Sequence, residues 1–284
     1  MNNITKKNTN MGVDYLTYKR LEEIPFIRHA FSTKNGGVSE GIYSSMNLSY
    51  TRGDEKEKVD ENFNRFFSAI GCTLKNVVCS DQIHKTDIVK VDEKVLKELE
   101  NKEKYSNEGV EARKLENIDG LITNLKNVPL VTSYADCVPL YFVDLKNKAI
   151  GLSHSGWRGT VGQIGIKTIE KMKKEYGTEP ENVVAVIGPS ICKECYEVSK
   201  EVTEEFHKAY DGKFDVSKIY DITSEEKRQL DLWEANRQIL MLAGVREDNI
   251  IVSNVCTSCN CDLLFSHRKT NGKRGNLIAV MEII

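Results

Sequence analysis

Two histidines and one cysteine are the residues of this chain best suited to chemistry. His84, Cys137 and His154 each lie at or just after a short apolar run typical of a β-strand. Two imidazoles and one thiolate are donors of borderline softness. They suit a tetrahedral Zn²⁺ whose fourth position is left to water or substrate. One interpretation of the three residues is therefore a catalytic metal site.

The same residues allow two further interpretations. Cys137 could be a nucleophile with His154 as its base, and Asp136 or a backbone carbonyl would then orient the imidazole. Alternatively, the histidines are separate hydrogen-bonded side chains and Cys137 is a small core residue. No two of the three form a local pair of the His-x-x-x-His kind. Residue types and spacing therefore leave the three interpretations open.

Cations close to glycine turns indicate an anion site. Arg158 stands between two glycines before a predicted helix, where a phosphate could meet both a guanidinium and a helix N-terminus. Arg268 and Arg274 belong to a second glycine-containing turn, for which an ordinary solvated hairpin is the alternative. The chain has no P-loop, no Gly-x-Gly-x-x-Gly turn and no Gly-x-Ser-x-Gly elbow.

Five further cysteines fall in two short segments, Cys192-Lys193-Glu194-Cys195 and Cys256-Thr257-Ser258-Cys259-Asn260-Cys261. Their spacing resembles that of metal ligands, and the two segments together could close a structural zinc site. That requires them to meet in space, and the Cys-x-Cys spacing is less typical of such sites. The sequence leaves a second metal undecided.

Composition limits the class of protein. The chain has 284 residues, with 40 Lys and Arg against 42 Asp and Glu, so we expect no general affinity for nucleic acid or anionic membranes. No apolar run has the length of a membrane span, and the first residues lack the apolar core of a signal peptide. We therefore expect a cytoplasmic protein with a small substrate. Its eight cysteines are then expected to be thiols or ligands rather than disulfides.

Strands and helices alternate without internal repeats. Helical spacing is predicted over 59–70, 160–176, 198–210 and 231–242. Strands are predicted over 27–33, 77–79, 88–91, 121–123, 128–132, 138–143, 149–153, 183–187, 250–255 and 277–283.

This pattern predicts an α+β fold, a single domain of mixed β-sheets with packed helices. We expect an N-terminal extension and first element over 1–27 and the catalytic domain over 28–284. The polar segment near 96–117 is expected to be a charged, solvated insertion. The oligomeric state cannot be predicted.

Ordered motifs from Arg28 to the C-terminus resemble those of a known family. They include Arg28-His29-Ala30-Phe31-Ser32-Thr33-Lys34-Asn35-Gly36-Gly37-Val38-Ser39, Met46-Asn47-Leu48-Ser49, Gln82-Ile83-His84, Asp119-Gly120-Leu121-Ile122-Thr123-Asn124, Ala135-Asp136-Cys137-Val138-Pro139, His154-Ser155-Gly156-Trp157-Arg158-Gly159, Ile187-Gly188-Pro189-Ser190-Ile191, Tyr196-Glu197-Val198, Cys256-Thr257 and Phe265-Ser266-His267-Arg268. The family is that of laccase-domain, YfiH-type purine nucleoside phosphorylases, formerly called multicopper polyphenol oxidoreductases.

The resemblance implies Zn²⁺ bound by His84, Cys137 and His154. It also implies phosphorolysis of adenosine, inosine and methylthioadenosine to a free base and a sugar 1-phosphate, together with adenosine deamination. Asp136 is the candidate for moving a proton.

The implied substrates are purine nucleosides and inorganic phosphate. Candidate phosphate ligands are Arg158, Arg268 and Arg274, and Arg28 and Asn47 are further pocket candidates.

The chain departs from the family pattern at two places. Lys85 stands where the family often has Gly, and Ser266-His267-Arg268-Lys269 replaces the commoner Ser-Tyr-Arg-Arg, which weakens the prediction of paired arginines.

Three different functions compete with the phosphorylase. A copper-dependent polyphenol oxidase, or laccase, needs more histidines than the five present. A metal-free Cys-His amidase would use Cys137 as its nucleophile and would be indifferent to metal removal. A cell-wall quality-control factor would have no enzymatic role.

Overall fold

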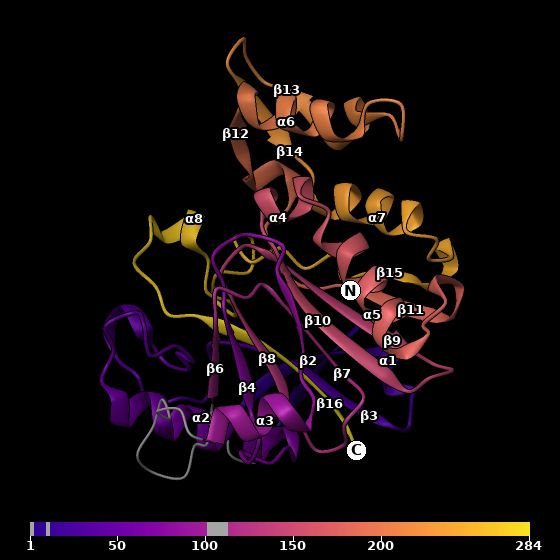
Figure 1. Cartoon of the computed structure of the whole chain (residues 1–284). Helices are drawn as coiled ribbons and strands as arrows, with labels where there is room; N and C mark the ends of the chain where they lie inside the picture. The colour runs from indigo at the N-terminus through magenta and orange to yellow at the C-terminus, as the bar shows by residue number, and fades with distance from the viewer. Residues whose placement is uncertain (1–2, 10–11, 101–112) are drawn as a thin grey trace.

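Two large β-sheets face each other in the computed structural model, which describes residues 3–9, 12–100 and 113–284 (Figure 1). The first sheet has seven strands in the order β1-β2-β3-β16-β8-β4-β6. Their bounds are β1 Ile4–Asn8, β2 Asp14–Tyr18, β3 Ile27–Ser32, β16 Leu277–Ile283, β8 Leu130–Tyr134, β4 Val78–Asp81 and β6 Arg113–Glu116.

The second large sheet has the order β15-β11-β9-β10-β7-β5. Its strands are β15 Ile250–Val252, β11 Val183–Ile187, β9 Val138–Asp144, β10 Ala149–Ser155, β7 Gly120–Thr123 and β5 Ile88–Lys90. Both sheets mix parallel and antiparallel pairs. The prediction of an α+β fold with mixed sheets is thus confirmed.

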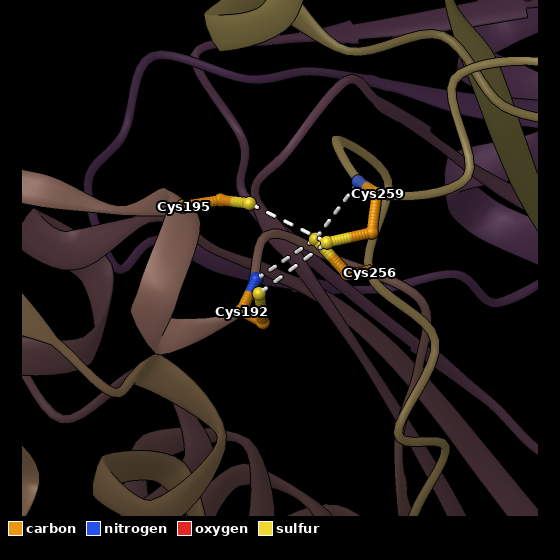
Figure 2. Close-up of side chains that lie close together, drawn as sticks. All are labelled: Cys192, Cys195, Cys256 and Cys259. Atoms are coloured by element: carbon orange, nitrogen blue, oxygen red, sulfur yellow. Dashed lines mark hydrogen bonds between the residues drawn. The ribbon is translucent and has the colours of Figure 1, made fainter.

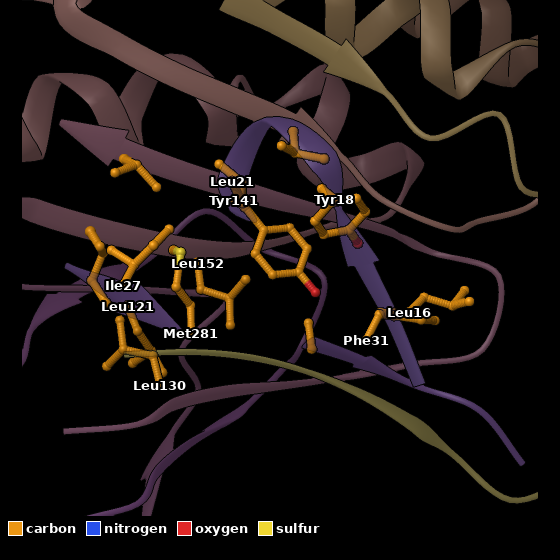
Figure 3. Close-up of a cluster of buried hydrophobic side chains, with 14 of the residues drawn as sticks. Leu16, Tyr18, Leu21, Ile27, Phe31, Leu121, Leu130, Tyr141, Leu152 and Met281 are labelled. Atoms are coloured by element: carbon orange, nitrogen blue, oxygen red, sulfur yellow. The ribbon is translucent and has the colours of Figure 1, made fainter. Parts of the chain in front are cut away.

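Strands β9 and β11 of the second sheet are buried along their whole length because both of their faces are covered. In β9, Tyr141 and Val143 point into the core between the sheets, whereas Leu140 and Phe142 pack against helices on the other face. Figure 3 shows part of the inter-sheet core, where Tyr141 and Leu152 meet side chains of the first sheet. The period-2 alternation of β9 therefore serves two apolar layers at once.

Helices cover the outer faces of both sheets. Helix α2 (Lys56–Ile70) packs Phe63, Phe66 and Phe67 against the first sheet, and α5 (Ile164–Tyr176) and α7 (Leu232–Leu242) cover the second. The remaining helices are α1 Lys19–Glu22, α3 Glu93–Glu100, α4 Trp157–Val161, α6 Lys200–Tyr210 and α8 His267–Thr270, with 3₁₀ turns η1 Gly41–Tyr43, η2 Pro180–Asn182, η3 Lys193–Cys195, η4 Val216–Ile219 and η5 Glu247–Asn249.

Two predicted helices are wrong in part. The helix expected over 160–176 is two helices, because Gln163 between α4 and α5 adopts a left-handed φ of 66°. Residues expected to begin the helix over 198–210 instead form β12 (Glu197–Ser199), which pairs with β14 (Lys227–Leu230) and, through it, β13 (Tyr220–Ile222). This small sheet lies with α6 at the top of Figure 1.

The predicted charged insertion is described only in part. Its first residues belong to α3 and its last residues include β6, whereas 101–112 lie outside the described residues. The division of the chain at residue 28 stays a prediction. No helix in the described ranges is both long and apolar enough to cross a membrane.

Buried His29 makes stability depend on pH. Its Nε2 accepts a hydrogen bond from the Tyr18 backbone N–H at 2.8 Å. Burial lowers the pKa of His29 from 6.5 to about 4, Glu22 opposing and Lys7 reinforcing the shift. Because the folded state resists protonation, this residue's stabilising contribution is complete above pH 6.5 and is lost as the pH falls towards 4.

The expected loss is about 3 kcal/mol of unfolding free energy over that pH range. Urea denaturation at several pH values should show a steeper decline for the wild type than for His29→Gln, whose side chain does not titrate. Parallel declines in the two proteins would contradict the prediction.

Candidate functional site

Residues from both large sheets meet at His84, Cys137 and His154. His84 lies in the loop after β4, Cys137 in the turn between β8 and β9, and His154 near the end of β10. Their candidate ligand atoms all lie within 4.8 Å of one another. The Cys137 Sγ is 3.8 Å from His84 Nε2, and the two imidazole rings meet edge to face with centroids 4.8 Å apart. His154 is buried and His84 is exposed, so the cluster opens to solvent on one side.

Asp119, which residue type and spacing did not single out as a site residue, positions both histidines. Its fully buried carboxylate faces His154 Nδ1 at 2.8 Å and accepts hydrogen bonds from the backbone N–H groups of His84 at 3.0 Å and Lys85 at 2.9 Å. Its engagement of Nδ1 leaves Nε2 of His154 as the ring atom able to bind a metal. The available signal was an acidic residue immediately before a buried strand.

Opposite charges in the cluster shift one another's pKa values towards the charged forms. Burial alone would raise the pKa of the Cys137 thiol, but the nearby His154 and His84 outweigh it and lower the pKa to about 6. Burial would lower the pKa of His154, whereas the Cys137 charge and the Asp119 hydrogen bond raise it to about 9. Burial would also raise the pKa of Asp119, yet the hydrogen bond from His154 holds it below its usual range. Cys137 is therefore a thiolate near neutral pH.

The backbone approaches the cluster closely at Gly156, the residue before α4. A Cβ added there would lie 3.0 Å from Cδ2 of His84 and 3.1 Å from the Cys137 Sγ. A larger residue at this position would press on both side chains, which would have to shift by a few tenths of an ångström.

A cavity of about 280 Å³ lies beside the cluster. His84, Cys137 and His154 all line it, and its apolar wall includes Phe63, Val131, Tyr134 and Ile278. Polar and charged side chains make up much of the rest of the lining. A concave site that combines apolar surface with polar groups is typical of small-molecule binding.

Two arginines line the same cavity, Arg52 and Arg274. Their Nε atoms are buried and have no hydrogen-bond partner within the described ranges. Burial, together with the charge of Arg52, lowers the pKa of Arg274 to about 10. Two partly buried guanidinium groups that repel each other form an environment suited to an anion. Arg274 was predicted, whereas Arg52 was missed although it also adjoins a glycine turn.

Predicted Asp136 is buried and already has partners for both carboxylate oxygens. Oδ1 accepts from the Thr257 hydroxyl at 2.6 Å and Oδ2 from the Arg268 backbone N–H at 2.7 Å. It adopts a left-handed φ of 89° directly before Cys137, so these hydrogen bonds help to place the cysteine. Its catalytic role stays a prediction.

Predicted residues Arg28 and Asn47 do not line the cavity. Arg28 forms an ion pair with buried Glu282 across β3 and β16. Buried Asn47 donates to Asp54 at 2.9 Å and accepts from the backbone N–H of cavity residue Asn276 at 2.9 Å. The structure thus gives both residues contacts that hold the surrounding chain, and their substrate roles stay predictions.

The two remaining predicted phosphate ligands, Arg158 and Arg268, lie outside the cavity lining. The Arg158 guanidinium stacks on Trp157 at 4.3 Å from the ring centroid. Arg268 lies over Tyr196 at 5.2 Å and donates to the Glu197 carbonyl at 2.8 Å. The structure therefore brings Arg274, but not these two, to the cavity wall, and their phosphate roles stay predictions.

The cluster has the chemistry needed to bind a metal ion. The 3.8 Å between the Cys137 Sγ and His84 Nε2 is close to the edge of a tetrahedral site, about 3.6 Å between nitrogen and sulfur ligands. Asp119 supplies the carboxylate hydrogen bond that metal-binding histidines usually make. The fold and site thus define an α+β protein with a Cys/His cluster that could hold a metal ion, beside a cavity.

Comparison with known proteins assigns that class to a family. The family model described as multi-copper polyphenol oxidoreductase laccase matches residues 28–284, and the chain belongs to this family. A Bacteroides thetaiotaomicron protein named purine nucleoside phosphorylase is 36% identical, with 98% of each chain covered. A protein named adenosine deaminase RL5, from an unknown prokaryote, is 34% identical over 88% of this chain and 93% of its own length.

A solved structure confirms the fold. The hypothetical protein YfiH from Bacillus licheniformis aligns with a TM-score of 0.87 and 30% identity, over 98% of this chain and 99% of that chain. The predicted family, the α+β fold and the prediction of an enzyme are confirmed by these similarities.

Proposed function

We propose that this chain is a zinc-dependent purine nucleoside phosphorylase that converts adenosine, inosine or methylthioadenosine and phosphate to a free base and a sugar 1-phosphate. The observation that carries the proposal is that the Cys/His cluster and the Arg52 and Arg274 pair open into one cavity. Phosphorolysis joins phosphate to the ribose carbon, so the nucleoside and the anion must be bound in the same cavity. The purine nucleoside phosphorylase name of the Bacteroides relative supports the same reaction.

Each part of the cavity has a role in this proposal. Arg52 and Arg274 bind phosphate and orient it towards C1′ of the ribose. The apolar wall formed by Val131 and Ile278 packs against the purine and excludes water from the sugar carbon. Asp119 holds His84 and His154 in place. Bound zinc would supply Lewis-acid and orienting chemistry.

Adenosine deamination is a second activity of the same site in this proposal. It is favoured by the relative named adenosine deaminase RL5. Proton transfer to and from the purine requires an acid and base at the site, for which Asp136 beside Cys137 is our candidate. Both oxygens of this carboxylate already accept hydrogen bonds, from Thr257 and Arg268. To move a proton, Asp136 must either break one of these bonds or use a remaining lone pair.

Product analysis with and without phosphate tests the proposal. Purified protein is incubated with adenosine, and base, sugar 1-phosphate and inosine are separated by chromatography. We expect adenine and ribose 1-phosphate only when phosphate is present, and inosine independently of phosphate. Base release without phosphate, or no reaction with any purine nucleoside, would contradict the phosphorylase assignment. Removal of metal and reloading with Zn²⁺ or Cu²⁺ then distinguishes zinc from copper.

Arg274→Gln is expected to raise the KM for phosphate by about 10- to 100-fold, because a charge-assisted hydrogen bond contributes about 1.5–3 kcal/mol. Steady-state kinetics at varied phosphate and saturating adenosine measure this effect. The matched control is Arg20→Gln, which removes an exposed arginine that pairs with Glu23 and does not line the cavity. If Arg158→Gln or Arg268→Gln changed the phosphate KM more than Arg274→Gln, the phosphate site would lie outside the cavity.

A further inference from the structure

Four cysteines form a second cluster away from the cavity: Cys192, Cys195, Cys256 and Cys259, called here the four-cysteine cluster. Their sulfur atoms all lie within 4.8 Å of one another (Figure 2). From this geometry we infer that the four-cysteine cluster is a structural zinc site, in addition to the Cys/His cluster.

Parallel strand pairing explains why the two segments meet. Strands β11 and β15 are parallel neighbours, and each is followed by one Cys-x-x-Cys segment. The pairing continues beyond the strands through an isolated bridge between Ser190 and Cys256. Segments 64 residues apart are therefore brought to the same edge of the sheet. A shared zinc site requires the two segments to meet in space, which the sequence alone could not show.

Distances between the sulfur atoms match a tetrahedral metal site. The Cys259 Sγ is 3.5 Å from the Cys195 Sγ and 4.0 Å from the Cys192 Sγ. Four sulfurs bound to one Zn²⁺ at about 2.3 Å are about 3.8 Å apart. The same atoms are well beyond the S–S bond length of about 2.05 Å, and all four cysteines are free thiols.

Two backbone N–H groups point at one sulfur atom of the cluster. The Cys256 Sγ accepts the backbone N–H groups of Cys192 and Cys259, both at 3.3 Å. One donor comes from the same Cys-x-x-Cys segment and the second from the opposite segment. Such bonds stabilise the negative charge of a ligating sulfur and orient it. A neutral thiol is a weaker hydrogen-bond acceptor, so two N–H groups aligned on one sulfur are less expected for a core cysteine.

The surroundings suit a structural rather than a catalytic metal. Four protein ligands complete a tetrahedron and leave no position for substrate. Cys192 and Cys256 are buried with Ile191, and Trp233 packs beside them, whereas Cys259 is exposed and offers the ion a way in. Tetrahedral sites with four sulfur ligands select zinc or iron.

The cluster is connected to the Cys/His site through Asp136. Thr257, next to Cys256, donates to the Asp136 carboxylate, and Ile191, next to Cys192, donates its backbone N–H to the Asp136 carbonyl at 3.0 Å. A metal that holds the two Cys-x-x-Cys segments together would therefore also hold the loop that carries Cys137. The role of the metal in the four-cysteine cluster is thus to position the loop that carries Cys137.

Metal analysis in a background lacking the Cys/His site tests the inference. The full-length Cys137→Ala variant is expected to retain a single zinc ion per chain, and X-ray absorption at the zinc edge should show sulfur ligands only. Adding Cys195→Ser should remove that ion and lower the melting temperature. Adding Cys261→Ser, which changes a neighbouring cysteine outside the cluster, should leave both unchanged. None of these readouts depends on enzyme activity.

Three results would overturn the inference of a structural zinc site. A Cys137→Ala protein without metal, purified anaerobically and offered Zn²⁺, would overturn the inference, as would iron in place of zinc. Intact-mass analysis showing disulfides between these cysteines in freshly purified protein would do the same. If Cys195→Ser fails to fold, thiol titration of Cys137→Ala decides: the four cysteines should react only after a strong chelator is added.

Discussion

Cys137→Ala is expected to reduce phosphate-dependent base release by at least about 100-fold, because loss of a ligand should cost more than the 10- to 100-fold typical of a group that merely orients one. The thiol lies in the β8–β9 turn, and its pKa of about 6 makes it a thiolate ready to bind metal at neutral pH. Alanine removes that donor and leaves only two imidazoles. Activity should fall together with the metal bound at this site, which elemental analysis measures.

A metal-free mechanism makes a different prediction for the wild type. If Cys137 is a nucleophile with His154 as its base, chelator-treated protein keeps its activity and alkylation of Cys137 abolishes it. If the cluster binds a catalytic metal, chelation removes the activity and added Zn²⁺ restores it. Circular dichroism of Cys137→Ala against the wild type shows whether the fold is retained. A fully active, metal-free protein would overturn the zinc mechanism.

Asp119→Asn is expected to weaken zinc binding at the Cys/His cluster by about 10- to 100-fold. The buried carboxylate accepts from the His84 and Lys85 backbone and faces His154 Nδ1. An amide has one acceptor oxygen, so its NH₂ group must face either the ring nitrogen or a backbone N–H. The His154 ring or the His84 loop then loses its orientation. Competition with a chromophoric chelator measures the affinity.

The same substitution is expected to lower the free energy of unfolding by about 2 kcal/mol, since hydrogen bonds to a buried charge are lost. Asp87→Asn is the matched control, because Asp87 is an exposed carboxylate in the same region of the chain. Zinc affinity equal to that of the wild type in Asp119→Asn would show that Asp119 does not position the ligands. Added zinc at high concentration should restore much of the activity if positioning is its role.

Residue chemistry was sufficient to select the three members of the Cys/His cluster. Imidazoles and a thiolate at the ends of apolar strands are rare, and strand ends of one fold converge at common edges. Asp119 was not selected, because an aspartate before a strand has many ordinary uses, and its role appears only when His84 and His154 lie on either side of it. Arg52 was missed for a similar reason: its significance comes from Arg274, which is distant in sequence.

Secondary structure was likewise predicted where it depends on local spacing and missed where it depends on distant contacts or a single backbone angle. Helices with long apolar stripes, such as α2 and α7, agree with prediction because burial of one face follows from local spacing. The break between α4 and α5 was missed, since a left-handed Gln163 next to Gly162 leaves the apolar spacing on both sides almost intact. The strand β12 was missed because its polar residues acquire their pairing from β14.

The sequence by itself determined the family, the α+β class and the chemical types at the Cys/His cluster, because these depend on residue identity and local order. Tertiary structure decided which of several cations reach the cavity and which carboxylate orients the histidines. It also decided that two distant Cys-x-x-Cys segments share one edge of a sheet. Hydrogen bonds, ion pairs and metal ligation act over a few ångströms, so they depend on how strands pair rather than on their distance along the chain.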